Sequence, residues 1–211
     1  MVPHESIGMR LEALGFLVIT WHAARQKRQL THQFFQLVDN SKTGVEAHHA
    51  SELAAVLGDG TVSSNGNFHG APVGYVLDFL AIVAADLGSI SERRTDRMLD
   101  RHRSHGLAPF LADDPGVDSG LMIAQYTQAA LVSENKRLAV PASVDSIPSS
   151  AMQEDHVSMG WHAARKLRLS VANLTRILAI ELVAAARAID LRAPLEPSSA
   201  SADVIRRLRA T

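Results

Sequence analysis

The polar run Gln153-Glu154-Asp155-His156 brings together side chains that could take part in chemistry. It combines an amide, two carboxylates and an imidazole, and it stands between a Pro/Ser-rich loop and a long apolar-periodic segment, residues 167–189. This position predicts a helix start, where unpaired N–H groups and the positive end of the helix dipole favour a polar ligand group. A structural interpretation is also open, because acids and amides commonly cap helices and fill first turns.

A second stretch of interest is Gly66-Asn67-Phe68-His69-Gly70, which directly precedes a clean helical pattern. Pro72 suits the first turn of that helix. Asn67 can be read as a turn residue and Phe68 as a core anchor, so a binding role for either needs further support. Just upstream, Gly58-Asp59-Gly60 is typical of a turn.

Helices are the elements that must position these residues, because apolar residues recur at three- and four-residue spacing and no strand pattern is convincing. We expect helices at about residues 5–29, 72–99, 119–138, 153–189 and 204–209. The sequence therefore predicts an all-α fold, an elongated bundle of long helices with irregular connecting loops. The faces predicted to be buried are Val73, Val76, Leu80, Val83, Leu87 and Ile90 in one helix, and Leu167, Val171, Leu174, Leu178, Leu182, Ala185 and Ile189 in another.

Composition excludes several function classes. The chain has 211 residues, 46% of them apolar, which is enough for a substantial core. A formal net charge of −1 gives no electrostatic case for nucleic acid or an anionic membrane. The absence of cysteine excludes a disulfide scaffold, a zinc–thiolate site and a thiol nucleophile. No secretory signal is visible, and the apolar runs 14–21 and 76–85 are too short to span a bilayer. We expect a cytoplasmic protein with no nucleic-acid or membrane partner.

Local catalytic motifs are absent from the sequence. There is no Gly-x-Ser-x-Gly elbow, no phosphate-binding Gly-x-x-x-x-Gly-Lys run and no dinucleotide fingerprint. His102 and His105 are spaced as metal ligands can be, but no third ligand is spaced to join them, so no metal site is predicted.

Several loops and helix starts, taken in order, resemble one known family. The chain is similar to the later part of the histidine ammonia-lyases, which belong to the aromatic amino acid ammonia-lyase superfamily. On this basis we divide it into a divergent, partly helical N-terminal segment (1–60), a lyase-like helical domain (61–193) and a partly flexible tail (194–211). The segments that carry the resemblance are Gly66-Asn67-Phe68-His69-Gly70, Gly88-Ser89-Ile90-Ser91-Glu92-Arg93-Arg94, Gly106-Leu107-Ala108-Pro109-Phe110-Leu111, Ser119-Gly120-Leu121-Met122-Ile123-Ala124-Gln125, Ser133-Glu134-Asn135-Lys136, Pro141-Ala142-Ser143-Val144-Asp145-Ser146 and Gln153-Glu154-Asp155-His156-Val157-Ser158-Met159-Gly160.

This resemblance implies an ammonia-lyase that converts L-histidine to urocanate and ammonia in histidine catabolism. The family forms homotetramers and builds its prosthetic group, 4-methylideneimidazol-5-one, from an Ala-Ser-Gly tripeptide. Glu154 matches the glutamate that contacts the substrate imidazole, and a carboxylate can accept an imidazole N–H. Phe68 matches a phenylalanine that lines the pocket. Gln153 and Asn67 are candidates for supporting groups around the substrate.

The sequence also departs from the family pattern, since it contains no Ala-Ser-Gly. Asp118-Ser119-Gly120 and Ala142-Ser143-Val144 each lack one member of that tripeptide. No catalytic residue is assigned, and the chain alone is predicted to be inactive. We expect self-association or a complementary lyase chain as partner. Two alternatives stay open. One is a non-catalytic helical remnant or an interaction partner of a lyase, and the other is a fragment of a phenylalanine or tyrosine ammonia-lyase or of an aminomutase.

Overall fold

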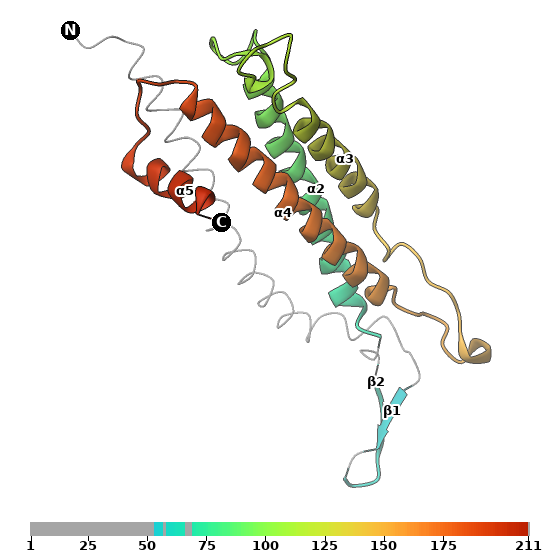
Figure 1. Ribbon diagram of the computed structural model, residues 1–211. Helices are drawn as coiled ribbons and strands as arrows, with labels where there is room; N and C mark the ends of the chain where they lie inside the picture. Colours follow the sequence, from blue (N-terminus) through green and yellow to red (C-terminus); the bar gives the residue numbers. More distant parts are fainter. Residues whose placement is uncertain (1–52, 57, 66–68, 211) are drawn as a thin grey trace. The chain divides into compact units, whose positions relative to one another are not determined.

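The computed structural model describes residues 53–56, 58–65 and 69–210, which form two compact units (Figure 1). Of the described residues, unit 1 contains Glu92–Thr127 and the chain from Ala179 onward. Unit 2 contains the described residues up to Ser91 together with Gln128–Leu178. The predicted helix at residues 5–29 lies outside the described part of the chain.

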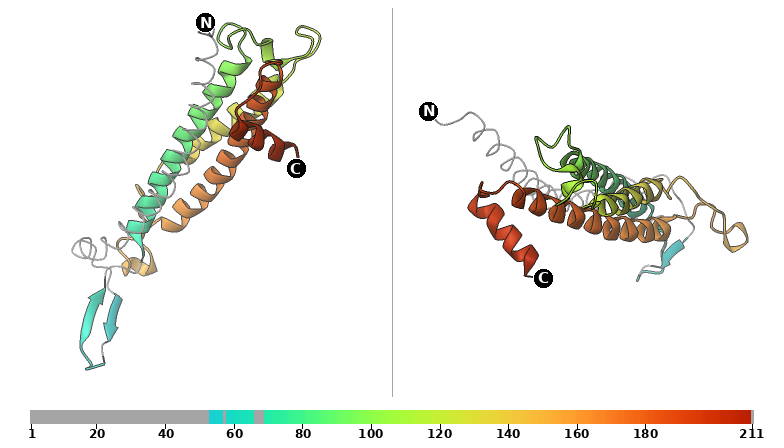
Figure 2. Two further views of the ribbon diagram at one scale, coloured as in Figure 1. Left: turned by 90° about the vertical axis from the view of Figure 1, so that its left-hand side faces the viewer. Right: turned by 45° about the horizontal axis from the view of Figure 1, so that its top comes forward.

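Three long helices each contribute a stretch to both units: α2 (Ala71–Leu99), α3 (Met122–Leu138) and α4 (Gly160–Asp190). Within a unit, the stretches of these helices lie side by side (Figures 1 and 2). Unit 1 adds the 3-10 turn η1 (Pro109–Leu111) and α5 (Ser199–Arg209), and unit 2 adds the 3-10 turn η2 (Ser150–Met152). The predicted all-α class, with long packed helices joined by irregular loops, is confirmed.

A short β-hairpin in unit 2 departs from the all-α expectation. β1 (Leu53–Val56) pairs antiparallel with β2 (Val62–Asn65), and Val56 lies opposite Val62. The predicted turn at 58–60 joins the strands, and there the Asp59 carboxylate accepts the Thr61 backbone N–H at 2.9 Å. Because each strand has only four residues and little apolar alternation, the sequence pattern does not reveal it.

The start of α4 differs from the prediction. The helix begins at Gly160 instead of near Gln153, and the Ser158 hydroxyl accepts the Gly160 N–H at 3.0 Å. Glu154 therefore lies in the connection before the helix and not in its first turn, so the predicted helix-start role is wrong. Glu154 and Asp155 are typical of the first turn of a helix, but here they precede the helix.

The terminal helix is longer than the predicted 204–209. α5 begins at Ser199, because the hydroxyl of Ser198 accepts the backbone N–H of Ser201 and caps the helix. The Ser/Ala-rich residues expected to be part of a flexible tail thus form the first turn of this helix.

The faces of α2 and α4 that were predicted to be buried are only partly buried. Val73, Ile90, Val171 and Leu178 are between 40% and 49% exposed. On α2 the small residues are buried instead, and a Cβ added to Gly88 would lie 3.2 Å from Ile177 Cδ1. Small residues let α2 approach the neighbouring helix closely, and this close approach determines which face of α2 is buried. The buried residues of α4 are Ala163, Ser170, Asn173, Ile177, Glu181, Ala184, Ala186 and Ala188.

Polar side chains are buried in unit 2 because they find partners on neighbouring helices. Asn135 Nδ2 donates to the Ser170 carbonyl at 3.1 Å, and Asn173 Nδ2 donates to Asn135 Oδ1 at 3.1 Å. Gln128 Nε2 donates to the Ile177 carbonyl at 2.9 Å. Such hydrogen bonds offset the desolvation of an amide, so an apolar-only pattern misplaces the core.

Unit 1 has its own small core of Leu99, Leu111, Ala184 and Ala188. Beside it, α2 and α4 are joined by a two-bond pair between the Arg94 guanidinium and the Glu181 carboxylate, with Arg94 Nη2 2.8 Å from Glu181 Oε2. Only 2% of the Glu181 side chain is exposed. An unpaired carboxylate there would be costly, so this pair fixes how the two helices align within the unit.

By length and composition alone, α2 and α4 are apolar enough to cross a membrane. Both helices nevertheless bury a carboxylate that is hydrogen-bonded inside the protein, Asp78 on α2 and Glu181 on α4. Long apolar helices with internally satisfied polar groups are also what the core of a helical bundle requires.

Candidate functional site

The connection between α3 and α4, residues 139–159 of unit 2, carries Glu154. Its backbone is closed on itself there: the Ser149 N–H donates to the Glu154 carbonyl at 3.0 Å, and the Glu154 N–H donates to the Ser149 carbonyl at 3.2 Å. The intervening Ser150, Ala151 and Met152 have positive φ values of 52°, 54° and 74°. Three successive non-glycine residues in the left-handed region are costly, and the two flanking hydrogen bonds hold them there.

Further hydrogen bonds fix this connection to the start of α2. Asp78, 4% exposed, accepts the backbone N–H of Ala142 at 3.0 Å and that of Ser143 at 2.8 Å. The Lys166 ammonium lies 3.7 Å from the same carboxylate. One carboxylate thereby joins α2, α4 and the connection that carries Glu154.

The two helix starts approach each other closely in unit 2. A Cβ added to Gly74 on α2 would lie 3.1 Å from the Cα of Gly160, the first residue of α4. Nearby, the Ser146 hydroxyl accepts the Val157 N–H at 3.0 Å. With both ends and the middle of the connection fixed, the position of Glu154 is determined by its surroundings.

Asp78→Asn is expected to lower the free energy of unfolding by about 2 kcal/mol at neutral pH, because the N–H groups of Ala142 and Ser143 lose their charged, buried acceptor. Asp86→Asn, an exposed carboxylate of the same helix, should leave it unchanged. Chemical denaturation of both variants checks this expectation, and equal stabilities would contradict the structural role of Asp78.

The same carboxylate makes stability depend on pH. Burial acts to raise the pKa of Asp78, but the nearby Ser143 hydroxyl, the N–H groups of Ala142 and Ser143 and the Lys166 charge together hold that pKa below its ordinary value of 3.8. A pKa that is lower in the folded state means that the contribution is full above 3.8 and is lost as pH falls toward the folded-state pKa. Denaturation of wild type at successively lower pH should therefore show a loss in this range that Asp78→Asn lacks.

The side chain of Glu154 meets an imidazole. His69 Nε2 lies 2.8 Å from Glu154 Oε2, and each side chain is 18% exposed. Within the described residues, Glu154 Oε1 accepts no hydrogen bond. In the sequence, the only signal for His69 is that it directly follows Phe68, so its place beside Glu154 could not be predicted.

The structure describes only part of the predicted site. Phe68 and Asn67 lie outside the described residues, so their predicted place beside Glu154 stays a prediction. Gln153 is described, and its side chain is exposed. The structure instead brings together His69, which follows Phe68, and Glu154, which follows Gln153.

Two segments that lack one member of Ala-Ser-Gly, Ala142-Ser143-Val144 and Asp118-Ser119-Gly120, have structural roles. Ala142 and Ser143 give their backbone N–H groups to Asp78, as described above. In unit 1, Asp118 Oδ1 accepts the Gly120 N–H at 2.7 Å, and a Cβ added to Gly120 would lie 2.4 Å from the Phe110 carbonyl oxygen. Both segments thus have structural roles, and neither contains the full tripeptide.

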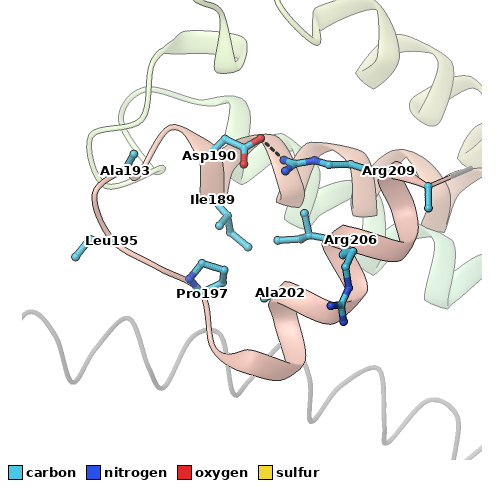
Figure 3. Close-up of a pocket in the computed structure, with 10 residues that line it drawn as sticks. Ile189, Asp190, Ala193, Leu195, Pro197, Ala202, Arg206 and Arg209 are labelled. Carbon is cyan, nitrogen blue, oxygen red and sulfur yellow. Dashed lines mark hydrogen bonds and ion pairs between the residues drawn. The ribbon is translucent and has the colours of Figure 1, made fainter.

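A cavity of about 590 Å3 lies between the end of α4 and α5, in unit 1 (Figure 3). Ile189, Leu195 and Pro197 give it an apolar lining, with Arg206 and Arg209 alongside. Arg209 Nη2 is 2.5 Å from Asp190 Oδ2, and Arg206 pairs with Asp203. Both guanidinium groups are thus already paired with carboxylates. None of the predicted site residues lines this cavity.

Comparison with known proteins defines the class. Residues 22–210 match the family described as aromatic amino acid lyase, and this chain belongs to that family. The match extends on both sides of residues 61–193, the range in which the sequence motifs lie.

Histidine ammonia-lyases are among the relatives of similar sequence, and the chain is a homologue of them. That of Streptomyces avermitilis is 77% identical over 160 residues, covering 76% of this chain and 31% of the relative. That of Streptomyces griseus is 75% identical over 169 residues, covering 79% and 33%. The chain thus spans about a third of the length of these relatives.

Solved structures of the family share the fold. A crystal structure of histidine ammonia-lyase from Trypanosoma cruzi matches 71% of this chain and 29% of its own, with a TM-score of 0.68 and 49% identity. The tyrosine aminomutase of Streptomyces globisporus matches 73% and 30%, with a TM-score of 0.69 and 39% identity. Because a histidine ammonia-lyase and a tyrosine aminomutase align equally well, the fold alone does not select a substrate.

Proposed function

We propose that this chain forms the part of a histidine ammonia-lyase that holds the substrate ring, with Glu154 accepting an imidazole N–H of L-histidine. One observation supports this assignment most strongly: the Glu154 carboxylate, held by a fixed connection, already accepts a hydrogen bond from an imidazole at 2.8 Å. The reaction is the elimination of ammonia from L-histidine to give urocanate, as part of histidine breakdown in the cytoplasm.

The contribution of this chain is orientation. A carboxylate of defined position holds the ring of the substrate and so places the rest of the amino acid relative to the groups that act on it, and orientation of this kind is a large part of enzymatic rate enhancement. The 211 residues contain no Ala-Ser-Gly. The electrophilic group that the family builds from that tripeptide must therefore be supplied by residues beyond this sequence, and we expect no turnover from these residues alone.

Exposed apolar side chains support a partner of the same family. On α2, Tyr75, Phe79 and Ile82 are between 45% and 55% exposed, and Trp161 at the start of α4 is 79% exposed. Tyr75, Phe79 and Ile82 recur at four- and three-residue spacing and so share one face of α2, and exposed apolar side chains grouped in this way are typical of an interaction site. We propose that lyase segments or chains carrying the Ala-Ser-Gly sequence cover this surface, and that the chain self-associates in their absence.

The test is complementation. The purified chain is mixed with a lyase fragment that carries Ala-Ser-Gly and ends before the region matched here, and L-histidine, L-phenylalanine and L-tyrosine are offered separately. We expect urocanate only when both components and L-histidine are present. Products from phenylalanine or tyrosine in place of urocanate would assign the chain to those relatives. No product from any substrate, despite complex formation, would favour a non-catalytic remnant.

A further inference from the structure

The pair formed by His69 and Glu154 has a defined direction. An ionised carboxylate has only acceptor oxygens, so His69 Nε2 must carry the hydrogen that lies between the two residues at 2.8 Å. The two residues are 85 positions apart in the sequence, and each side chain is 18% exposed. A mostly buried, charge-assisted hydrogen bond of this kind is among the stronger polar contacts in proteins.

This bond removes the remaining freedom of the Glu154 side chain. The backbone of Glu154 is fixed by its exchange of hydrogen bonds with Ser149. His69 Nε2 donates to Oε2 of Glu154, while Oε1 accepts no hydrogen bond within the described residues. One oxygen is thus occupied by the protein and the other is left to an incoming N–H donor.

We propose that His69 is a positioning residue: by holding Oε2 of Glu154, it presents Oε1 to the substrate imidazole and so contributes to the choice of an imidazole-bearing substrate. This inference rests on the proposed function of Glu154. A substrate whose ring carries an N–H gains from an acceptor held in place, whereas a phenyl ring has no donor to offer. His69 should therefore affect the use of histidine far more than the use of phenylalanine.

The competing explanation is that His69 stabilises its own segment without acting through Glu154. The effect of losing His69 would then add to any effect of changing Glu154. If His69 acts through Glu154, the two effects cannot add, because the second substitution removes an interaction that is already lost. A double-mutant cycle separates the two explanations.

The experiment uses the complemented lyase with wild-type chain, His69→Leu, His69→Gln, Glu154→Gln and the double variant His69→Leu/Glu154→Gln. For His69→Leu we expect KM for L-histidine to rise about tenfold while kcat changes by less than about threefold. His69→Gln keeps an N–H donor and should stay within about threefold of wild type. In the Glu154→Gln background, His69→Leu should change KM no further.

Two kinetic outcomes would overturn the proposal in different ways. A large effect of Glu154→Gln together with no effect of His69→Leu, or fully additive effects, would remove His69 as a positioning residue and leave the proposed function intact. No effect of Glu154→Gln would remove the proposed function and this inference with it.

A measurement that needs no turnover checks the contact itself. In 15N NMR spectra of the purified chain, His69 should show a protonated Nε2, and its ring signals should shift in Glu154→Gln but not in Asp155→Gln. Ring signals of His69 that are identical in wild type and Glu154→Gln would show that the contact is absent, and the proposal would be wrong.

Discussion

Replacing Glu154 by alanine is expected to lower kcat/KM for L-histidine by about 100-fold or more in the complemented lyase, because the substrate ring loses its charged acceptor and with it its orientation. The free energy of unfolding should change by only about 1 kcal/mol, since Glu154 lies before α4 and its side chain makes one hydrogen bond within the described part of the chain, to His69. Rates of urocanate formation and denaturant titrations of the same preparations give the two numbers.

Asp155 offers a matched control. It is the adjacent carboxylate, it is exposed, and its replacement by alanine should leave kcat/KM within about twofold of wild type. Equal losses in the Glu154→Ala and Asp155→Ala variants would mean that the connection tolerates no change. A wild-type rate in Glu154→Ala would remove this residue from the site.

The largest loss of stability is expected at the Arg94–Glu181 pair of unit 1. Arg94→Met should lower the free energy of unfolding by about 3–5 kcal/mol, because it leaves the carboxylate of Glu181, 2% exposed, without its bidentate partner. Arg94→Lys should lose less, since an ammonium keeps the charge but not the two parallel bonds. Denaturant titrations of the three proteins measure the differences.

Arg207→Met serves as the control for this prediction. Arg207 pairs with Asp203 on the surface of α5, where its side chain is 80% exposed, and such pairs contribute little. We expect no measurable change in its unfolding midpoint. Comparable losses at Arg94 and Arg207 would show that burial does not set the importance of the Arg94–Glu181 pair.

The positions of α2 and α3 could be predicted well from sequence, but the starts of α4 and α5 and the buried faces of the long helices could not. α2 runs over Ala71–Leu99, close to the predicted 72–99, because periodicity and Pro72 mark it clearly. Its buried face was misassigned because Asp78, Gly88 and Ser91 are buried through partners and close approaches on other segments. A pattern based on apolarity has no means of representing such tertiary partners.

The candidate site likewise combines a residue that the sequence identifies with contacts that only the folded chain shows. Glu154 was found through the family resemblance, and the homology to histidine ammonia-lyases is confirmed. The contacts that position it join His69 to Glu154 over 85 residues and Asp78 to Ala142 over 64. Contacts between residues so far apart in the sequence produce no periodic pattern, so only the folded structure reveals them.

One measurement tests the central claim most directly: the side-chain carboxyl 13C resonance of Glu154 followed during titration with L-histidine. The chain is assembled with a partner fragment whose Ala-Ser-Gly serine is replaced by alanine, so that bound histidine is not consumed. We predict a saturable shift of the Glu154 resonance with L-histidine and none with L-phenylalanine. A Glu154 resonance that does not move at saturating L-histidine would contradict the proposed contact.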